Sequence, residues 1–404
     1  MKNPEQKKEL PVKMATETGV KPQDPMRILL ITHGNLERQG INSFMLEWIK
    51  ALKAIDFNYE TTIYFRGEMK DQCLADTYRY YGAELCFGCL PENTTTTNPV
   101  YRKKIQNDLC NILREKKYDI VHINTSIKGF TILALQEALR AGVPIRISHS
   151  HGRILDSMGK RIYHPLLQRY IRRTATAYAG CSAYAGLYMF GKAGVNSAKW
   201  HFIPNAIDTE KFSFDESSRN RCRKKLNLDS DKILIGAVGA LNEVKNHIFL
   251  LNVMQKLRQA GKKAMLILFG DGDMLPVLNE KASAMGLSDC VVFYGATSDI
   301  PSWLSALDCY VMPSLSEGLP IAAVEAQANG LPCLLSNHVP HELDLCTDVY
   351  HLPIDAGPEP WVQIVLNLPG KSSQEREQGA ENVRKAGFGK ESMPEYVRLL
   401  YGIK

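Results

Sequence analysis

Residues 309–332 read C-Y-V-M-P-S-L-S-E-G-L-P-I-A-A-V-E-A-Q-A-N-G-L-P, which predicts a strand, a loop and a helix in succession. The first four residues are apolar and predict a buried strand. Residues 313–318 predict a loop. We expect Pro320 to be the first helical residue, because proline there lacks only an N–H that would be unpaired anyway. Gly330 and Pro332 then predict the helix end.

Two carboxylates, Glu317 and Glu325, flank the predicted start of this helix. Glu317 lies in the loop, and Glu325 is expected about two turns into the helix. Unpaired backbone N–H groups and the positive end of the helix dipole favour an anionic group at such a position. A carboxylate there can accept hydrogen bonds from sugar or ribose hydroxyls. The pattern indicates a nucleotide-sugar site, with a surface acid before an ordinary amphipathic helix as the alternative.

The alternation of apolar runs and helix-like segments recurs along the chain and predicts two domains, each with a parallel sheet. A chain of 404 residues with 45% hydrophobic content also exceeds one typical core. Ligands of such domains bind at the carboxyl ends of the strands, so facing sheets would place both sites in a cleft. The expected units are a disordered tail at 1–25, a first Rossmann-like domain at 26–204, a second at 205–387 and a C-terminal helix at 388–404. The predicted strands begin at residue 26 and span 59–65, 119–123, 145–150 and 176–181, then 233–239, 264–269, 291–294, 309–312 and 332–335.

The overall charge and the cysteines exclude several classes of protein. The 49 Lys and Arg against 43 Asp and Glu give a net charge of +6, which is too mildly basic to indicate a nucleic-acid partner. No apolar run reaches the roughly 18 residues of a membrane span, and residues 1–25 lack the apolar core of a signal peptide. We therefore expect a cytoplasmic protein. The C-F-G-C at 86–89 has no second ligand pair for zinc, so no metal site is expected.

Two further loops after predicted strands carry residues suited to a phosphorylated ligand. In G-A-V-G-A-L-N-E-V-K-N-H, Lys245 and Asn246 open a helix, where the lysine either reaches a diphosphate or remains a solvated side chain. In F-G-D-G-D-M, Gly270 and Gly272 allow backbone to approach a ligand, and they also suit an ordinary turn.

Three histidines lie near predicted strand ends in the first domain. His122 ends D-I-V-H, and R-I-S-H-S-H places His149 and His151 on one side of a strand end. Each could donate to a sugar hydroxyl or assist proton transfer near neutral pH. A satisfied structural histidine is the alternative, and it is favoured for His122.

The strings A-Y-A-G-C-S, I-P-N-A-I-D, V-K-N-H, E-G-L-P and E-A-Q-A-N-G-L-P together resemble, in order and spacing, the retaining glycosyltransferases of family 4. The resemblance covers residues 26–404 and is densest over 203–342. It is strongest to the branch that assembles capsules and exopolysaccharides. It implies an α/β protein with the GT-B fold, in which two Rossmann-like, doubly wound domains face each other across a cleft. It also implies that the C-terminal helix crosses back to the first domain.

The resemblance also implies roles for individual positions. Glu317 would approach the donor sugar, and Glu325 would hold the ribose. Ala240 stands where the family has an arginine that, with Lys245, neutralises the donor diphosphate. The implied catalytic residues are Glu317, His149, His151 and Lys245, and the implied donor-binding residues are Gly40, Lys245, Asn246, Gly270, Gly272, Gly318, Leu319 and Glu325.

The implied activity is metal-independent, retaining sugar transfer from a nucleotide diphosphate, expected to be UDP, to a hydroxyl of a glycan or polyprenyl-linked glycan, with no cofactor. Because Ala240 removes one cation, a non-catalytic subunit that binds donor or glycan is the first alternative. An epimerase or a phosphorylase on the same scaffold is another, but the acid–base groups or pyridoxal lysine that these need are not evident. The basic stripe at 160–173 predicts either a solvated helix face or peripheral contact with the inner face of the cell membrane.

Overall fold

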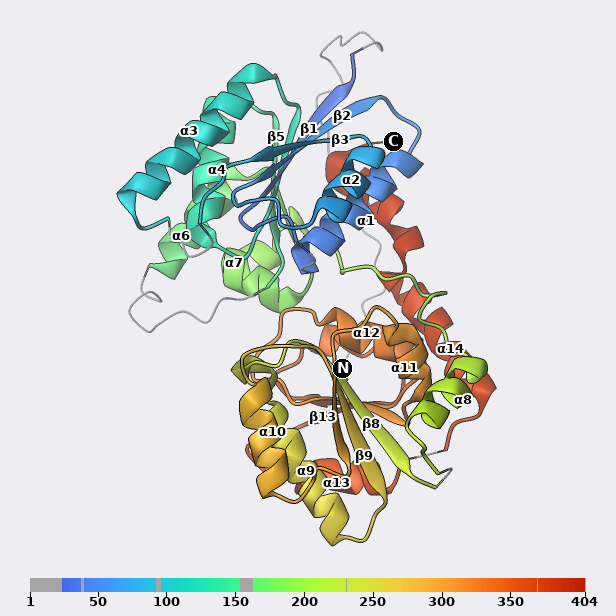
Figure 1. Cartoon of the computed structure of the whole chain (residues 1–404). Coiled ribbons are helices and arrows are strands. Elements are labelled where there is room, and N and C mark those ends of the chain that lie inside the picture. The colour runs from blue at the N-terminus through green and yellow to red at the C-terminus, as the bar shows by residue number, and fades with distance from the viewer. Residues whose placement is uncertain are drawn as a thin grey trace.

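The computed structural model describes residues 24–37, 40–91, 96–152, 163–229, 231–368 and 370–403. Over these residues the chain forms two domains, each built around a parallel sheet (Figure 1). The two-domain α/β architecture expected from the sequence is confirmed. All but the last two residues of the predicted tail at 1–25 lie outside the described residues. No helix within the described ranges combines the length and the apolar character needed to cross a bilayer.

The first domain has a seven-stranded sheet in the order β3-β2-β1-β4-β5-β6-β7. Helices cover both faces, with α1, α2 and α15 on one side and α3, α4, α6 and α7 on the other (Figure 1). The central strands are apolar because both of their faces are buried. The elements are β1 (Met26–Thr32), α1 (Gly40–Ala54), β2 (Tyr59–Phe65), α2 (Gln72–Tyr80), β3 (Ala83–Phe87), α3 (Pro99–Glu115), β4 (Ile120–Asn124), α4 (Lys128–Arg140), β5 (Ile145–Ser150), α6 (His164–Thr174), β6 (Ala177–Gly180), α7 (Ala183–Val195) and β7 (Trp200–Phe202).

The second domain has a six-stranded sheet in the order β10-β9-β8-β11-β12-β13. Helices α8, α11, α12 and α14 pack on one face, and α9, α10 and α13 pack on the other. The elements are α8 (Glu216–Lys225), β8 (Ile233–Val238), η1 (Glu243–Lys245), α9 (His247–Gln259), β9 (Ala264–Phe269), α10 (Leu275–Ala284), β10 (Val291–Gly295), α11 (Ile300–Ala306), β11 (Cys309–Met312), α12 (Ile321–Ala328), β12 (Cys333–Ser336), η2 (His341–Leu343), β13 (Val349–Leu352), α13 (Glu359–Leu366), α14 (Ser373–Val383), η3 (Arg384–Phe388), η4 (Lys390–Ser392) and α15 (Met393–Tyr401).

The strand order reverses once in each sheet. In the first sheet the reversal lies between β1 and β4, and in the second it lies between β8 and β11. Doubly wound sheets bind ligands at such switch points, beyond the carboxyl ends of the strands. The loops that follow β8 and β11 are therefore the expected location of a ligand in the second domain.

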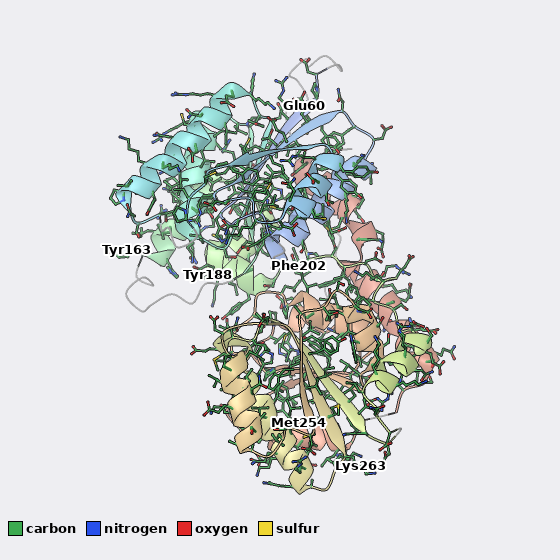
Figure 2. All side chains as sticks on the ribbon, viewed as in Figure 1. Glu60, Tyr163, Tyr188, Phe202, Met254 and Lys263 are labelled. Atoms are coloured by element: carbon green, nitrogen blue, oxygen red, sulfur yellow. The ribbon has the colours of Figure 1, made fainter. Side chains whose placement is uncertain are left out.

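Two chain segments connect the domains, and they pair with each other. The N–H of Ile207 donates to the carbonyl of Phe388 at 2.8 Å, and the N–H of Lys390 donates back to Ile207 at 2.9 Å. The ring of Phe202, at the boundary between the domains, lies 6.2 Å from the ring of Phe388 (Figure 2). After this crossing, α15 packs beside α1 in the core of the first domain. The predicted return of the C-terminal helix is confirmed.

The structure corrects two details of the predicted strand–loop–helix unit. Pro320 is the N-cap residue, with an extended ψ of 109°, and α12 begins one residue later at Ile321. The carbonyl of Pro320 accepts the N–H of Ala323 at 3.1 Å, so the proline still starts the helical hydrogen bonding. Glu325 therefore lies about one turn into α12 and not two.

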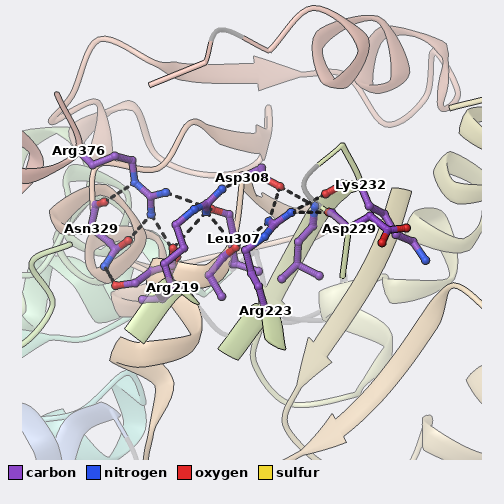
Figure 3. Close-up of polar contacts among 12 residues, drawn as sticks. Arg219, Arg223, Asp229, Lys232, Leu307, Asp308, Asn329 and Arg376 are labelled. Atoms are coloured by element: carbon purple, nitrogen blue, oxygen red, sulfur yellow. Dashed lines mark hydrogen bonds and ion pairs between the residues drawn. The ribbon is translucent and has the colours of Figure 1, made fainter. Parts of the chain in front are cut away.

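An arginine cluster holds α8 and α14 against the second sheet (Figure 3). Arg219 and Arg223 donate to the two carboxylate oxygens of Asp308 at 2.6 and 3.0 Å, and Asp308 also accepts the N–H of Leu234 at 2.7 Å. The buried Arg376 donates to carbonyls at the C-terminal ends of α11 and α12. Asp308 precedes β11, so this cluster lies at the amino edge of the sheet, opposite the switch-point loops.

Candidate active site

The loops after β8 and β11 meet beyond the switch point and bring two predicted site residues together. Lys245 Nζ lies 2.6 Å from Glu317 Oε1, and their side chains are only 22% and 11% exposed. The N–H of Leu315 donates to the carbonyl of Val244 at 2.8 Å, which ties the two loops together. A positioned cation and a positioned carboxylate therefore share one place at the carboxyl edge of the sheet.

The short 3-10 turn η1 explains how Lys245 is presented. The side chain of Asn242 caps this turn by accepting the N–H of Lys245 at 3.1 Å. Asn246 ends it in the left-handed conformation, with φ of 54°, which asparagine tolerates better than most residues. The amide of Asn246 then donates to the carbonyl of Pro313 at 3.3 Å. The structure thus gives Asn246 a role in building the site.

Gly270 and Gly272 are required by the packing of two loops. A Cβ on Gly270 would lie 2.0 Å from the carbonyl oxygen of Gly239, and a Cβ on Gly272 would lie 2.5 Å from that of Leu241. Both glycines also have positive φ, of 136° and 156°. Their absent side chains let the loop after β9 lie against the loop after β8. This packing accounts for both glycines, whether or not their backbone also meets a ligand.

The E-G-L-P loop touches the first domain directly. A Cβ on Gly318 would lie 3.0 Å from Gly152 Cα and 3.2 Å from the carbonyl oxygen of His151. The neighbouring Leu319 is 6% exposed and packs in the core of the second domain. The side chain of Leu319 is therefore occupied by core packing, whereas Gly318 allows the two domains to approach.

Glu325 and Gly40 come from different domains and line one cavity of about 1050 Å³ between them. Lys211, in the segment that follows the first domain crossing, lines the same cavity. Glu317 and Lys245 are not among its lining residues. Burial raises the pKa of Glu325 to about 7, although nearby Lys211 opposes the shift. The cavity thus holds a carboxyl group that ionises near neutral pH and a lysine that favours its ionised form.

The raised pKa of Glu325 predicts a stability difference that depends on pH. Its folded-state pKa lies above the unfolded value, so its contribution is fully present at low pH and is lost as pH rises through 7. The free energy of unfolding of Glu325→Gln, relative to that of wild type, should therefore rise by about 1–2 kcal/mol from pH 5 to pH 8.5. This range allows for the partial exposure of the side chain to solvent. Urea unfolding at both pH values measures the difference.

The matched control is Glu381→Gln, at an exposed ion pair on α14. Its stability relative to wild type should not rise over the same pH range. A constant difference between wild type and Glu325→Gln across pH would contradict the raised pKa.

A chain of hydrogen bonds runs from the C-terminal helix to the buried histidines of the first domain. Trp48 Nε1 donates to Tyr401 Oη at 2.8 Å, and this oxygen lies 3.1 Å from His122 Nδ1. His122 Nε2 lies 3.2 Å from His149 Nδ1. A tryptophan N–H can only donate, so the tyrosine oxygen accepts it, and among the described residues the tyrosine proton has an acceptor only if it points to His122 Nδ1. His122 and His149 then both carry their proton on Nε2, and within the described chain His149 Nε2 has no partner.

His151 differs from His149 in its free ring nitrogen, which carries a lone pair and not a proton. Asn124 donates its amide N–H to the carbonyl of His122 at 3.3 Å, which turns Asn124 Oδ1 toward His151 Nε2 at 2.9 Å. The proton of His151 is therefore on Nε2, and Nδ1 carries a lone pair that has no partner of good hydrogen-bond geometry among the described residues, although the side chain of Asn205 lies close to this ring. The rings of His149 and His151 stack at 4.3 Å. An N–H donor and a nitrogen lone pair thus lie side by side.

These histidines are neutral at physiological pH. Burial lowers the pKa of His122 to about 3 and holds the pKa of His149 well below its usual range. Burial and the nearby His33 also lower the pKa of His151. This environment favours hydrogen bonding to a hydroxyl over proton uptake near pH 7. Of the two predicted cleft histidines, His151 is the one beside the loop of the second domain.

Tyr401→Phe tests the tautomers assigned along this chain. We expect ¹⁵N NMR of the histidine rings to show His122 and His149 as Nε2–H tautomers in wild type, with altered His122 Nδ1 shifts in the variant. Loss of the hydroxyl leaves Trp48 Nε1 unpaired and should cost about 1–3 kcal/mol of stability. The control is Tyr396→Phe, which removes a hydroxyl from the same helix. Unchanged His122 signals in Tyr401→Phe would contradict the assignment.

Several residues of this site carry no local sequence signal. Tyr401 and His122 are 279 positions apart, and only the return of α15 brings them together. Trp48 and Asn124 lie in an ordinary apolar helix and an ordinary strand. Lys211 was detectable in principle, because it closely follows the I-P-N-A-I-D turn that marks the first crossing.

Two family models match the chain, one in each domain. A model described as Glycosyltransferase Family 4 matches residues 39–211, and a model described as Glycosyl transferases group 1 matches residues 218–350. Together they cover the segments that hold Lys245, Glu317, Glu325 and the three buried histidines.

Individual proteins show the same likeness. EpsF of Bacillus subtilis (strain 168), which is named as a glycosyltransferase, is 32% identical over 67% of this chain and 71% of its own length. The UDP-Gal:α-D-GlcNAc-diphosphoundecaprenol α-1,3-galactosyltransferase of Escherichia coli is 29% identical over 57% of this chain, which spans 60% of that enzyme. The crystal structure of Anabaena HepE in complex with UDP superposes with a TM-score of 0.73, at 15% identity, over 93% of this chain and 99% of that one. The family models, the relative EpsF and the shared two-domain architecture together show that the chain belongs to the family 4 glycosyltransferases with the GT-B fold.

Proposed function

We propose that this glycosyltransferase transfers a sugar, with retention, from a UDP-sugar to a hydroxyl of a glycan or lipid-linked glycan in surface polysaccharide synthesis. The observation that carries the proposal is the Lys245–Glu317 pair, held 2.6 Å apart at the switch point beside the His151 segment of the other domain. This arrangement brings a cation and a carboxylate to the junction between the domains, where the backbone of the His151 segment meets the same loop.

Each part of the junction suits one requirement of the reaction. Lys245 and the nearby start of α9 would stabilise negative charge on the departing nucleotide diphosphate without a bound metal. Glu317 would face the donor sugar, and Glu325 would accept hydrogen bonds from the ribose hydroxyls. The leaving phosphate would help to deprotonate the acceptor, because the neutral histidines are poor bases. This division of roles accounts for same-face attack without an enzymatic nucleophile.

The choice of substrates rests on named relatives. The Escherichia coli relative is named for a UDP-sugar donor and an acceptor linked to diphosphoundecaprenol, and HepE was crystallised with UDP.

A lipid-linked acceptor would place the protein at the inner face of the membrane. Helix α6 supports that location, because it has Arg172 and Arg173 in its last turn and its Leu166 is 66% exposed. Tyr163 precedes this helix at the surface (Figure 2). Residues 160–162 of the predicted basic stripe lie outside the described residues.

A non-catalytic subunit that binds donor or glycan is the second candidate, and one observation favours it. Ala240 occupies an exposed position in the loop before Lys245, so the arginine that the family pattern expects there is missing. Lys211 lies with Glu325 in the neighbouring cavity, close enough to oppose the rise in the pKa of that carboxyl group, and is a candidate cation to compensate.

The deciding experiment measures nucleoside diphosphate release from a panel of nucleotide sugars, with wild type beside Glu325→Ala. It is run in lipid-free buffer and with anionic vesicles that carry polyprenyl-linked glycan. Acceptor-dependent release that the variant abolishes would support transfer and identify the donor. Donor binding without release under every acceptor condition would overturn the proposal in favour of the binding subunit. Free monosaccharide or a pyridoxal absorbance would instead indicate the epimerase or phosphorylase.

A further inference from the structure

We propose that His341, Asp344 and His351 form a binding site for a divalent transition metal such as Zn²⁺. The site lies on the second domain, outside the switch-point loops, and it does not depend on the proposed sugar transfer. It goes beyond the expectation, drawn from the sequence, that the chain has no metal site.

The three side chains already converge on one point. His341 Nδ1 lies 3.0 Å from Asp344 Oδ2, and His351 Nε2 lies 2.6 Å from Asp344 Oδ1. The rings of His341 and His351 are 3.9 Å apart, and one ligand atom from each of the three residues lies within 4.8 Å of the others. The carboxylate thus sits between two imidazole nitrogens, and a small inward movement would allow all three to bind one ion.

The type of ligand selects the type of metal. Imidazole nitrogen suits zinc, cobalt, nickel and copper, whereas magnesium and calcium prefer oxygen ligands alone. Two histidines and one carboxylate leave a fourth tetrahedral position for water. His341 is 73% exposed and Asp344 is 40% exposed, so an ion can reach the site from solvent. His351, at 11% exposed, anchors it to the sheet.

The backbone holds the ligands in place before any ion arrives. His341 is the first residue of the 3-10 turn η2 and Asp344 is its C-cap, and Leu343 between them is fully buried. The next two N–H groups, those of Leu345 and Cys346, donate to the side chain of Gln327 on α12. His351 projects from β13, the edge strand of the sheet. A turn and a strand fixed by separate contacts therefore supply the ligands.

One feature limits the expected affinity. His351 Nδ1 is buried and has no hydrogen-bond partner among the residues that the structure describes. Metal-bound histidines usually donate this second N–H to a protein acceptor, and loss of such a partner weakens binding by about 10- to 100-fold. We therefore expect weaker binding than in a site whose histidines are fully supported.

Metal binding would also affect the contact between the domains. Glu342 lies within the same turn, between two of the ligands, and its Oε1 accepts the N–H of Ala183 at 2.8 Å. Ala183 is the first residue of α7 in the other domain. An ion that fixes this turn would hold Glu342 against the positive end of α7. Occupancy of the metal site should thus strengthen one interdomain contact.

Cobalt titration of the full chain, freed of metal with a chelator, tests the site. We expect wild type to bind one equivalent of Co²⁺ with tetrahedral d–d absorption, and excess Zn²⁺ to displace it. His341→Ala and His351→Ala should both lose this saturable binding. The matched control is His338→Ala, which removes an exposed histidine from the same loop and should bind as wild type does. Because His341 is itself exposed, its variant should stay folded, which circular dichroism checks.

Two outcomes would overturn the proposal. One is the absence of stoichiometric binding, which would leave the cluster as a hydrogen-bonded carboxylate. The other is binding that persists in both variants, especially with thiolate charge-transfer bands that point to Cys86 and Cys89. Hydrogen exchange of the peptide containing Ala183 tests the interdomain effect. Exchange should slow on Zn²⁺ addition in wild type and stay unchanged in His351→Ala, and equal exchange in wild type with and without Zn²⁺ would refute the coupling.

Discussion

Lys245→Ala should lower kcat for sugar transfer about 10²- to 10³-fold, by analogy with removal of one donor that stabilises developing negative charge. Lys245 is held by its bond to Glu317 and by the cap from Asn242, so it would meet the diphosphate of the proposed donor in a fixed position. Its removal also leaves the carboxylate of Glu317, which is 11% exposed, without its cation. Initial rates of nucleoside diphosphate release give kcat and KM for both proteins.

The loss should appear mainly in kcat, because charge on the leaving group is greatest in the transition state. Lys256→Ala is the matched control, since it removes the same charge from an exposed ion pair on α9. Its rates should equal those of wild type. A rise in KM with unchanged kcat in Lys245→Ala would show that this lysine only holds the donor. Ala240→Arg in the Lys245→Ala background should recover part of the rate if a cation at that loop is what is missing.

The strands that the sequence predicted, and those that it missed, follow one physical rule. The interior strands are buried on both faces, so they appear as continuous apolar runs. The three strands that were not predicted, β3, β7 and β13, are all edge strands. Their sequences, A-E-L-C-F, W-H-F and V-Y-H-L, are short or interrupted by polar residues, because one side of each faces no neighbouring strand. The edge strand β10 was predicted because its V-V-F-Y run is apolar.

The candidate site also has features that the sequence could predict and features that it could not. Lys245 and Glu317 were predictable, because each follows a buried strand and strands on either side of a switch point place their loops together. The structural reasons for Gly270 and Gly318 were not predictable, since both depend on backbone from another loop or domain. The proposed metal-binding cluster was not among the sequence predictions, because its three residues combine a turn and an edge strand that no motif connects. Local patterns thus locate a strand-end loop, but they do not show what packs against it.

No sequence pattern singled out Asp308, but the structure predicts that its replacement has a large effect on stability. Its carboxylate forms ion pairs with both Arg219 and Arg223, and its charge also acts on the buried Arg376. It also accepts the N–H of Leu234 at the start of β8. Burial alone would raise the pKa of Asp308, but the hydrogen bond from Arg219 and the nearby charges lower it overall. The carboxylate is therefore ionised in the folded protein and compensates a cluster of positive charge.

Asp308→Asn should cost about 3 kcal/mol of unfolding free energy at pH 7, because it leaves partly buried arginines without their counter-ion. Urea unfolding of variant and wild type measures this loss. The same substitution at Asp289, in an exposed pair with Arg258, should cost less than about 1 kcal/mol. Since the folded pKa of Asp308 is depressed, its contribution is present above the unfolded pKa and disappears as pH falls through the folded value. The difference in unfolding free energy between wild type and Asp308→Asn should therefore become smaller in acid. A difference that stays constant down to pH 2 would show that the asparagine disturbs packing and not charge.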